Sequence, residues 1–429
     1  MADLTLRRCR LPGRFDELVD IAIEGNRITA ISPQLPSSDT PSSSQDIQDQ
    51  DINIDGKLVS PPFVESHIHL DSALTAGEPR WNSSGTLFEG IEIWRERKQS
   101  LTLDDVQDRA IAALKLMAGQ GTLFVRSHAD VSESTLTALK GLLAVKEKVK
   151  DWVTLQIVAF PQDGLYGSPQ NAELMEEALR LGADAVGGIP HYEMTREDGV
   201  QSVHTIFELA QRYDRLIDIH CDEIDDEQSR FLEVMAACAI RHDYGHRTTA
   251  SHTTAFGSYN DAYAFKLMGM LQRAHLNFIA NPLINITLQG RTDTYPKRRG
   301  VTRVKELWQR GLNVSLGNDC IQDPWYSLGT GNLLDVASMA VHVCQMTGMD
   351  EIAACYDMVT THGAQTLNLG DAYGLAVGRP ANLIVLDAVS PYDAIRRRAT
   401  VTHVIARGQI LAQTVPTATH WHGTEKGKS

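Results

Sequence analysis

The sequence predicts an α/β protein: a (β/α)8 TIM-type barrel with a small β-sandwich domain built from both chain ends. Three observations carry this prediction. Apolar strand-like runs alternate with helical stretches through the middle of the chain, polar residues collect where those strands end, and short β patterns lie near both termini. A chain of 429 residues exceeds one ordinary core and suits a barrel with an accessory domain. We expect the barrel at residues 61–375 and the two parts of the small β domain at 1–60 and 376–429.

The composition is that of a globular enzyme, with 42% apolar and 22% charged residues. The formal net charge of −14 argues against a nucleic-acid or anionic-membrane surface, because either would need a concentrated basic patch. The six cysteines include no Cys-x-x-Cys pair, and no stretch resembles a signal peptide or a membrane span. We therefore expect a cytoplasmic protein that binds a small molecule, and neither nucleic acid nor a membrane.

The small β domain is predicted from short alternating patterns near both termini, at residues 4–11, 18–32, 381–387 and 401–411. Glu24-Gly25-Asn26 has the composition of a hairpin turn within the second of these runs. Residues 33–51 are rich in Ser, Pro, Asp and Gln and nearly free of large apolar side chains. Such a stretch buries too little surface to order itself strongly, so we expect a flexible surface loop.

The barrel is predicted from eight strand-like runs, at residues 64–71, 122–130, 153–162, 185–191, 216–223, 248–253, 277–285 and 313–320. Helical patterns separate them, among others at 104–117, 173–181, 203–212 and 229–241. Eight β-α units over about 250 residues match the size of such a barrel. A doubly wound open sheet would carry a glycine-rich phosphate turn after an early strand, and no G-x-G-x-x-G motif is present.

Polar residues occupy the carboxyl ends of these predicted strands, where the active sites of barrels lie. They are His67, His69, His128, Gln162, His191, His220, Glu223, His252, Asn281 and Asp319. Histidines scattered at random would not favour strand ends so consistently. The sequence therefore predicts one active site at this end of the barrel, in which His128, His191 and Asn281 either line the pocket or support it.

A metal site is predicted from His67 and His69, which lie at positions i and i+2 of one strand. Side chains alternate between the two faces of a strand, so the two imidazoles project together. His220 and Asp319 each end another apolar run and add a third imidazole and a carboxylate. Such a set leaves a coordination position open for water, which is typical of a hydrolytic rather than a structural site. We expect a single ion, because residues 187–191 offer no lysine for a bridging carbamate.

Glu223 and His252 are the candidates for proton transfer and charge stabilisation. A divalent ion lowers the pKa of a bound water from about 15.7 toward about 7. Glu223, three residues after His220, is placed to carry protons from that water to the leaving group, although it also belongs to the acidic run 222–227. His252 would polarise the water or stabilise the developing charge. The other class of function is a metal-dependent binding protein without catalysis, against which Glu223 argues because binding needs no proton shuttle.

Seven stretches resemble the amidohydrolase superfamily and, within it, the bacterial cytosine deaminases: residues 61–71, 85–91, 159–162, 220–229, 250–254, 294–300 and 323–326. The resemblance implies a mononuclear Fe2+ or Zn2+ site with His67, His69, His220 and Asp319 as ligands, and with Glu223 and His252 beside the water. It also implies that Gln162 holds the carbonyl and ring-nitrogen edge of a pyrimidine base and that Trp325 forms an apolar wall. A homo-oligomer, for example a hexamer, is a further implication.

One departure from the family concerns the substrate. Cytosine deaminases usually show His-Asp-Asp after the eighth strand, whereas this chain has Asn318-Asp319-Cys320. A methyl group at C5 of the pyrimidine should fit better beside a thiol than beside a carboxylate, because burying a charge against apolar surface is costly. We expect a hydrolytic deaminase that converts 5-methylcytosine to thymine, cytosine to uracil, or both, releasing ammonia, and that also accepts 5-fluorocytosine.

Two alternatives stay open within the same superfamily. Cys320 is a neutral change in a plain cytosine deaminase, or the protein deaminates or ring-opens another heterocycle such as isocytosine, a purine or creatinine. The residues do not decide between Fe2+ and Zn2+, since both ions accept imidazole and carboxylate ligands.

Overall fold

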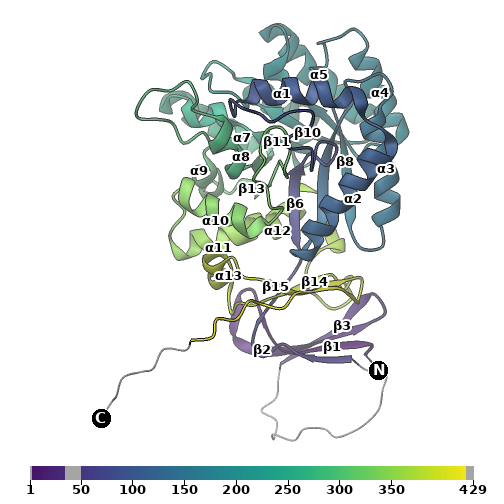
Figure 1. Ribbon diagram of the computed structural model, residues 1–429. Coiled ribbons are helices and arrows are strands. Elements are labelled where there is room, and N and C mark those ends of the chain that lie inside the picture. The colour runs from purple at the N-terminus through teal and green to yellow at the C-terminus, as the bar shows by residue number, and fades with distance from the viewer. Residues whose placement is uncertain (1, 34–49, 422–429) are drawn as a thin grey trace, which may run out of the picture.

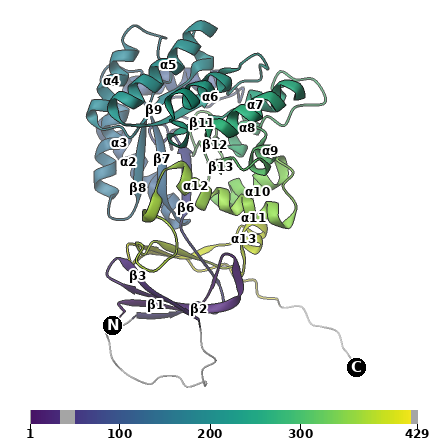
Figure 2. The same ribbon diagram turned by 180° about the vertical axis from the view of Figure 1, so that it is seen from behind.

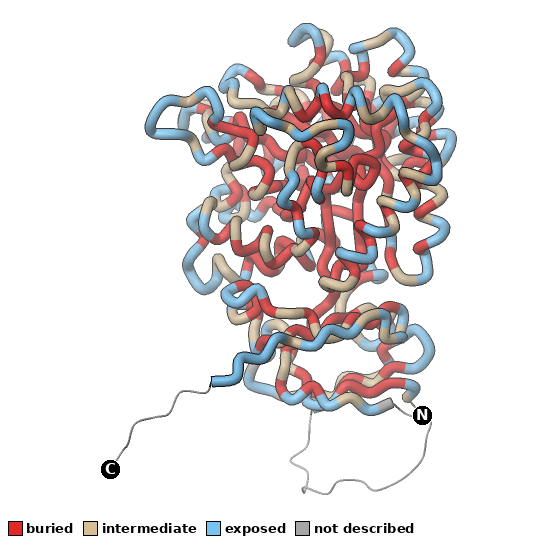
Figure 3. The backbone as a smooth tube through the Cα atoms, viewed as in Figure 1, coloured by how far each residue is buried: buried red, intermediate tan, exposed pale blue. Residues whose placement is uncertain are grey.

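The computed structural model describes residues 2–33 and 50–421. Eight parallel strands form a barrel in the larger part of the molecule (Figure 1): β6 (Phe63–Ile68), β7 (Thr122–Asp130), β8 (Thr154–Phe160), β9 (Ala185–Gly188), β10 (Leu216–Cys221), β11 (Thr248–His252), β12 (Asn277–Ala280) and β13 (Asn313–Leu316). They pair in chain order, and they are buried along nearly their whole length (Figure 3). The predicted (β/α)8 barrel is confirmed.

The barrel closes between its first and last strands, just beyond β13. Ile68 and Asp319 form a parallel bridge, in which the Asp319 amide donates to the carbonyl oxygen of His67 at 2.8 Å. The His69 amide donates in return to the Asp319 carbonyl oxygen at 3.0 Å. The backbone bonds that close the barrel therefore involve three residues predicted to bind the metal.

Helices surround the barrel strands and also lie at both ends of the barrel (Figures 1 and 2). They are α1 (Leu87–Arg97), α2 (Leu103–Gly119), α3 (Thr137–Val149), α4 (Asn171–Leu181), α5 (Arg196–Tyr213), α6 (Phe231–His242), α7 (Asp261–Ala274), α8 (Pro282–Leu288), α9 (Val304–Gln309), α10 (Leu333–Val343), α11 (Met349–Met358), α12 (Thr361–Thr366) and α13 (Pro391–Arg397). Side-chain caps fix several starts: Thr102, Thr195 and Asn260 accept from backbone amides in the first turns of α2, α5 and α7. Within the described residues, no helix is both long and apolar enough to cross a membrane.

Two predicted strands are partly wrong, because each gives way to a helix that begins at a proline. In the run 185–191, β9 ends at Gly188 and a 3-10 helix begins at Pro190. The run 277–285 was expected to be extended throughout, but β12 ends at Ala280 and α8 begins at Pro282. Proline lacks an amide hydrogen and has a fixed φ, so it suits the first turn of a helix and cannot continue a buried strand. The consequence is functional, because α8 contributes side chains to the cavity described below.

The small domain contains strands from both chain ends: β1 (Leu4–Leu11), β2 (Arg14–Glu24), β3 (Arg27–Pro33), β4 (Gln50–Asn53), β5 (Leu58–Ser60), β14 (Leu383–Leu386), β15 (Val401–Ala406) and β16 (Gln409–Gln413). The order is β16-β15-β14-β5-β1-β2-β3, with β4 beside β1. In Figure 1, β14 and β15 lie between the barrel and β1–β3. Buried Leu6, Ile21, Val59, Leu383 and Ile405 form a core shared by both chain ends.

The expected two-ended β domain is thus confirmed, with two differences in detail. The run 401–411 divides into β15 and β16 at Arg407-Gly408, where both residues have positive φ. In the expected loop 33–51, Pro33 ends β3 and Gln50 begins β4, while residues 34–49 lie outside the described part. The domain limits at 60/61 and 375/376 stay a prediction.

Candidate active site

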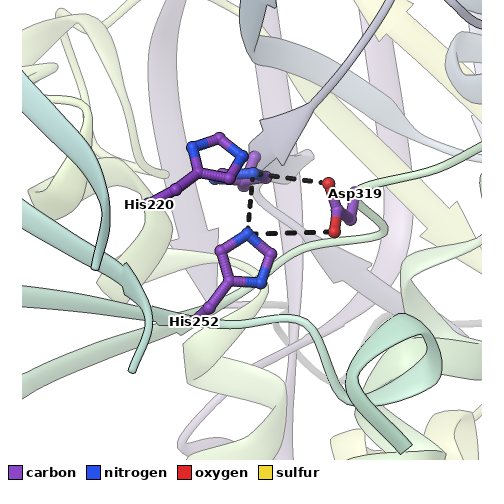
Figure 4. Close-up of side chains that lie close together, drawn as sticks. His220, His252 and Asp319 are labelled. Atoms are coloured by element: carbon purple, nitrogen blue, oxygen red, sulfur yellow. Dashed lines mark hydrogen bonds and ion pairs between the residues drawn. The ribbon is translucent and has the colours of Figure 1, made fainter. Parts of the chain in front are cut away.

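Four imidazoles and one carboxylate converge at the carboxyl ends of the barrel strands. His69 Nε2 lies 3.1 Å from His220 Nε2, and both His67 Nε2 and His69 Nε2 lie 3.4 Å from Asp319 Oδ1. His252 Nε2 lies 3.3 Å from His67 Nε2 and 3.9 Å from Asp319 Oδ2. Figure 4 shows His220 and His252, at the ends of β10 and β11, facing Asp319, which lies on the loop after β13. The structure therefore brings together all four predicted ligands and adds His252 to the same cluster.

The backbone at two of these positions has an unusual conformation. His252 has a φ of 66° and Asp319 a φ of 67°, in the left-handed region that residues other than glycine seldom adopt. Holding such a residue there costs on the order of 1–3 kcal/mol. The turn at the end of each strand directs the side chain back over the barrel, so the surrounding fold maintains this arrangement at an energetic cost.

The cluster fits a divalent metal ion by its donor atoms and its protonation. Burial lowers the pKa of His69 and His220 well below the usual value, and it lowers the pKa of His252 to about 3. These imidazoles are neutral at pH 7 and keep a lone pair for a metal. Neutral nitrogen donors with a carboxylate suit Zn2+ or Fe2+. Since His252 lies as close to the others as His69 does, the choice of His67, His69, His220 and Asp319 as ligands stays a prediction.

Glu223 lies beside this cluster. Its Oε1 atom is 3.1 Å from His252 Nδ1, and its side chain is buried at the edge of a cavity. Burial, followed by the charge of Asp319, raises the pKa of Glu223 well above its usual value. Asn285 Nδ2 also lies 3.0 Å from His252 Nδ1, and Asn281 Nδ2 lies 3.4 Å from His252 Nε2. A buried carboxyl group in this position can exchange a proton with a substrate in the cavity.

Three residues beneath the cluster were not predicted from the sequence. The Ser251 hydroxyl donates to Asp218 Oδ1 at 2.5 Å, and Ser251 Oγ lies 3.2 Å from His67 Nδ1. Since the single hydroxyl hydrogen is used on Asp218, Ser251 must accept from His67, which leaves the lone pair of His67 on Nε2. Arg126 Nη1 donates to Asp218 Oδ2 at 3.0 Å. The sequence does indicate Arg126 indirectly, because it is a charged residue within an otherwise apolar strand.

Glu65 joins the first and last barrel strands behind the metal cluster. Its Oε1 atom accepts from the backbone amides of His67 and Asn318, each at 3.1 Å, and its Oε2 atom accepts from Asn318 Nδ2 at 2.6 Å. Burial raises the pKa of this carboxyl group to about 7. Glu65 thus ties the His-x-His segment to the residue before Asp319. It was also missed, although an acidic residue within a buried strand could have indicated it.

Two unassigned histidines lie close to the cluster. The His128 ring centroid is 4.1 Å from that of His67 and 5.1 Å from that of His69. Both ring nitrogens of His128 and the Nδ1 atom of His191 are buried without a hydrogen-bond partner among the described residues. His191 lines the cavity, whereas His128 has a ring nitrogen within 4.8 Å of those of His67 and His69, and its Nε2 atom lies 3.7 Å from Asp218 Oδ1.

A cavity of about 350 Å³ lies over the cluster, with His69, His220, Glu223 and Asp319 in its lining. We call these four residues and His67 the polar floor. Gln162, Cys320 and Trp325, the residues predicted to bind the substrate, also line the cavity, and their binding roles stay a prediction. The buried residues Cys320, Ile284 and Leu288 pack together, with Leu87 and Trp325 against them. We call these five residues the apolar wall.

Cys320 belongs to the apolar wall by its environment. It is 3% exposed, and burial, followed by the charges of Asp323 and Asp319, raises the pKa of its thiol well above the usual value. The thiol is therefore uncharged at neutral pH and unsuited to act as a nucleophile. Ile284 and Leu288 come from α8, the helix that the sequence analysis took for the end of a strand, so this side of the cavity was only partly predicted.

The fold and the polar floor define the class of protein. The model of the amidohydrolase family matches residues 50–412, and the chain belongs to this family of metal-dependent enzymes. This chain is similar to the crystal structure of 5-methylcytosine deaminase from Klebsiella pneumoniae liganded with 5-fluorocytosine, with 48% sequence identity. It superposes with a TM-score of 0.93, and the match covers 97% of this chain and 99% of that one. A second structure of that enzyme, liganded with phosphonocytosine, matches equally well, with a TM-score of 0.93.

More distant relatives are named for another substrate, N-isopropylammelide. N-isopropylammelide isopropyl amidohydrolase of Pseudomonas sp. (strain ADP) is 28% identical over 417 residues, which are 96% of this chain and 97% of that protein. N-isopropylammelide isopropylaminohydrolase from Burkholderia multivorans has a TM-score of 0.81 at 26% identity, with 96% of this chain and 99% of that one covered. The predicted membership of the amidohydrolase superfamily is confirmed by these matches.

Proposed function

We propose that this protein is a metal-dependent hydrolytic deaminase of free pyrimidine bases, which converts 5-methylcytosine to thymine and cytosine to uracil and releases ammonia. The observation that carries this proposal is the uncharged Cys320 in an apolar wall directly beside the polar floor. The similarity to a 5-methylcytosine deaminase that was crystallised with 5-fluorocytosine supports the same substrate class. 5-Fluorocytosine is accordingly proposed as a further substrate.

The metal part of the proposal assigns His67, His69, His220 and Asp319 as ligands of one Fe2+ or Zn2+ ion. When bound, this ion supplies the activated water for hydrolysis. Ser251 keeps His67 in the tautomer that a ligand requires, because it accepts from His67 Nδ1.

Glu223 and His252 are the proposed proton-handling residues. Glu223 carries two protons in turn. It takes one from the water and delivers it to the ring nitrogen as the oxygen adds to C4, and it then takes the second from the resulting hydroxyl group and delivers it to the amino group, so that the C4–N bond breaks, ammonia leaves and a carbonyl remains. A pKa raised by burial suits this role, because the carboxyl group must bind and release protons near neutral pH. His252, 3.1 Å from Glu223, stabilises the developing charge beside the water.

Gln162, Cys320 and Trp325 are the proposed substrate-binding residues. The Gln162 amide binds the carbonyl and ring-nitrogen edge of the pyrimidine, since an amide offers both a donor and an acceptor. A buried amide discriminates strongly, because the wrong ligand leaves it unpaired. Trp325 covers one face of the cavity, and Cys320 lies next to C5 and its substituent.

The test is kcat/KM for cytosine and 5-methylcytosine on metal-replete protein, with Cys320→Asp and Cys320→Ala alongside. The wild-type protein should turn over 5-methylcytosine. Cys320→Asp should lose activity on 5-methylcytosine by about tenfold or more while keeping cytosine, because a buried carboxylate disfavours the methyl group. Cys320→Ala adds no charge and should keep both activities.

Two results would revise the proposal. If only cytosine reacts, in the wild type and in Cys320→Asp alike, the protein is a plain cytosine deaminase and Cys320 is a neutral change. If no cytosine analogue reacts but isocytosine, a purine or creatinine does, the substrate class is wrong.

We further propose that the protein is cytoplasmic and that it forms a homo-oligomer, for example a hexamer. Light scattering on the purified protein would test the oligomeric state.

A further inference from the structure

Gly90 on α1 makes an unusually close approach to Trp325. A Cβ atom added at Gly90 would lie 2.4 Å from Cδ1 and 2.7 Å from Nε1 of Trp325, closer than real Cβ atoms come to a neighbour. Gly90 lies in the interior of α1 and does not have positive φ, so an L-residue could adopt its backbone conformation. The glycine is therefore required by the indole ring and not by the helix.

The face of α1 that carries Gly90 points at the cavity. Leu87 and Ile91 line the cavity, and Gly90 lies next to Leu87 on the helix surface because residues three apart are neighbours. Trp94, one turn further along, is buried, and its ring centroid lies 6.3 Å from that of Trp325. Gly90 is thus the point on this face where the indole lies against the helix backbone.

The backbone at Trp325 is held in place. Its amide donates to Asp323 Oδ1 at 3.0 Å, and the carbonyl oxygen of Pro324 accepts from Asn82 Nδ2 at 3.0 Å. The indole itself is packed against the other members of the apolar wall and borders the cavity. A side chain at position 90 would therefore displace the indole by rotation, and the empty space available to it is the cavity.

We propose that Gly90 is a positioning residue for substrate specificity: by leaving room for Trp325 it sets the width of the cavity beside Cys320, and so determines whether a pyrimidine with a substituent at C5 is accepted. This inference rests on the proposed function for the identity of the substrate. A methyl group at position 90 pushes the indole toward the space where the 5-methyl group is expected. Cytosine, which has only hydrogen at C5, needs less of that space.

The contact itself is tested by thermal stability, without any substrate. Gly269 in α7 is the matched control, since an added Cβ there meets nothing within 4 Å. Alanine favours a helix over glycine, so Gly269→Ala should raise Tm. Gly90→Ala should lower Tm in the wild-type background and raise it in a Trp325→Ala background. If Gly90→Ala raises Tm in both backgrounds, the contact does not constrain Trp325 and the inference fails.

The specificity is tested by kcat/KM for 5-methylcytosine and cytosine. Gly90→Ala should lower the ratio of the two values by about tenfold, mainly through a higher KM for 5-methylcytosine, as expected for the loss of space for one methyl group. Trp325→Phe in the Gly90→Ala protein should restore the ratio, because the smaller ring leaves the room that the added methyl group takes. Gly269→Ala should leave both values unchanged.

Failure of this inference differs from failure of the proposed function. An equal loss on both bases in Gly90→Ala, without recovery in the double variant, would overturn the role of Gly90 in specificity while the deaminase stands. If metal-replete wild-type protein turns over neither base, the proposed function is wrong. The proposal that Gly90 controls acceptance of a substituent at C5 then fails with it. In that case the opposite Tm shifts in the two backgrounds would still support Gly90 as the residue that places Trp325.

Discussion

The polar floor of the cavity and its apolar wall differ in how their side chains are held. On the floor, His67 is oriented by Ser251, Asp218 and Arg126, and hydrogen bonds join these groups in series. On the wall, Cys320 and Trp325 are placed by van der Waals packing against neighbours from α1 and α8. Hydrogen bonds fix the orientation of a side chain and the positions of its polar atoms, whereas close packing fixes the volume that a side chain can occupy.

This difference separates two functional roles. A change to the floor should lower the turnover of every substrate and leave the preference between them unaltered. A change to the wall, such as Cys320→Asp or Gly90→Ala, should alter the preference and spare the reaction itself. Three experiments on the floor test that separation, from the largest expected effect to the smallest.

Metal removal should have the largest effect. Chelation and dialysis should reduce the turnover of cytosine and 5-methylcytosine together to background, because the activated water depends on the ion. Adding Fe2+ or Zn2+ separately should restore both activities, and the ion that restores more identifies the preferred metal. Metal content by atomic emission is the companion measurement, and turnover retained by metal-free protein would contradict the assignment of the floor.

Glu223→Gln should lower kcat by about 10²–10⁴ on both bases, because glutamine cannot carry the proton. The ratio of kcat/KM between the two bases should stay unchanged. Glu227→Gln, an exposed acid of the same acidic run, is the matched control and should have little effect. Turnover by Glu223→Gln within about tenfold of the parent would show that Glu223 is no proton carrier.

Asp218→Asn should weaken metal binding by about 10- to 100-fold, the usual cost of removing a partner behind a ligand histidine. An asparagine amide can donate to Ser251, which then no longer has to accept from His67 Nδ1, so the lone pair on Nε2 is no longer enforced. Competition with a chelator measures the affinity directly. Asp184→Asn, in a partly exposed ion pair with Lys146, is the control.

The outcome at saturating metal separates an orienting role from a merely structural one. Asp218→Asn should then regain most of its turnover with an unaltered preference between the two bases. If Asp218→Asn binds the metal as tightly as the wild-type protein does, then Arg126, Asp218 and Ser251 do not orient His67 for metal binding.

The predictable part of the site consists of residues whose signal is local. His67 and His69 project together because a strand alternates its side chains, and His220 and Asp319 stand out because each ends an apolar run. Arg126 and Glu65 left a weaker signal, a charge within a buried strand. The partners of Arg126 on other strands include Gln156, Asp218 and Thr249, and they follow from the barrel register and not from the pattern of any one segment.

The sequence by itself determined the barrel, the β domain built from both chain ends and the groups that could hold a metal, because these depend on periodicities of two and 3.6 residues and on chemical type. The tertiary structure decided that His252 Nε2 lies 3.3 Å from His67 Nε2 and that Gly90 lies against Trp325. These contacts join segments far apart in the chain. The distance between the contacting side chains depends on how whole elements pack, and no local sequence pattern predicts that distance.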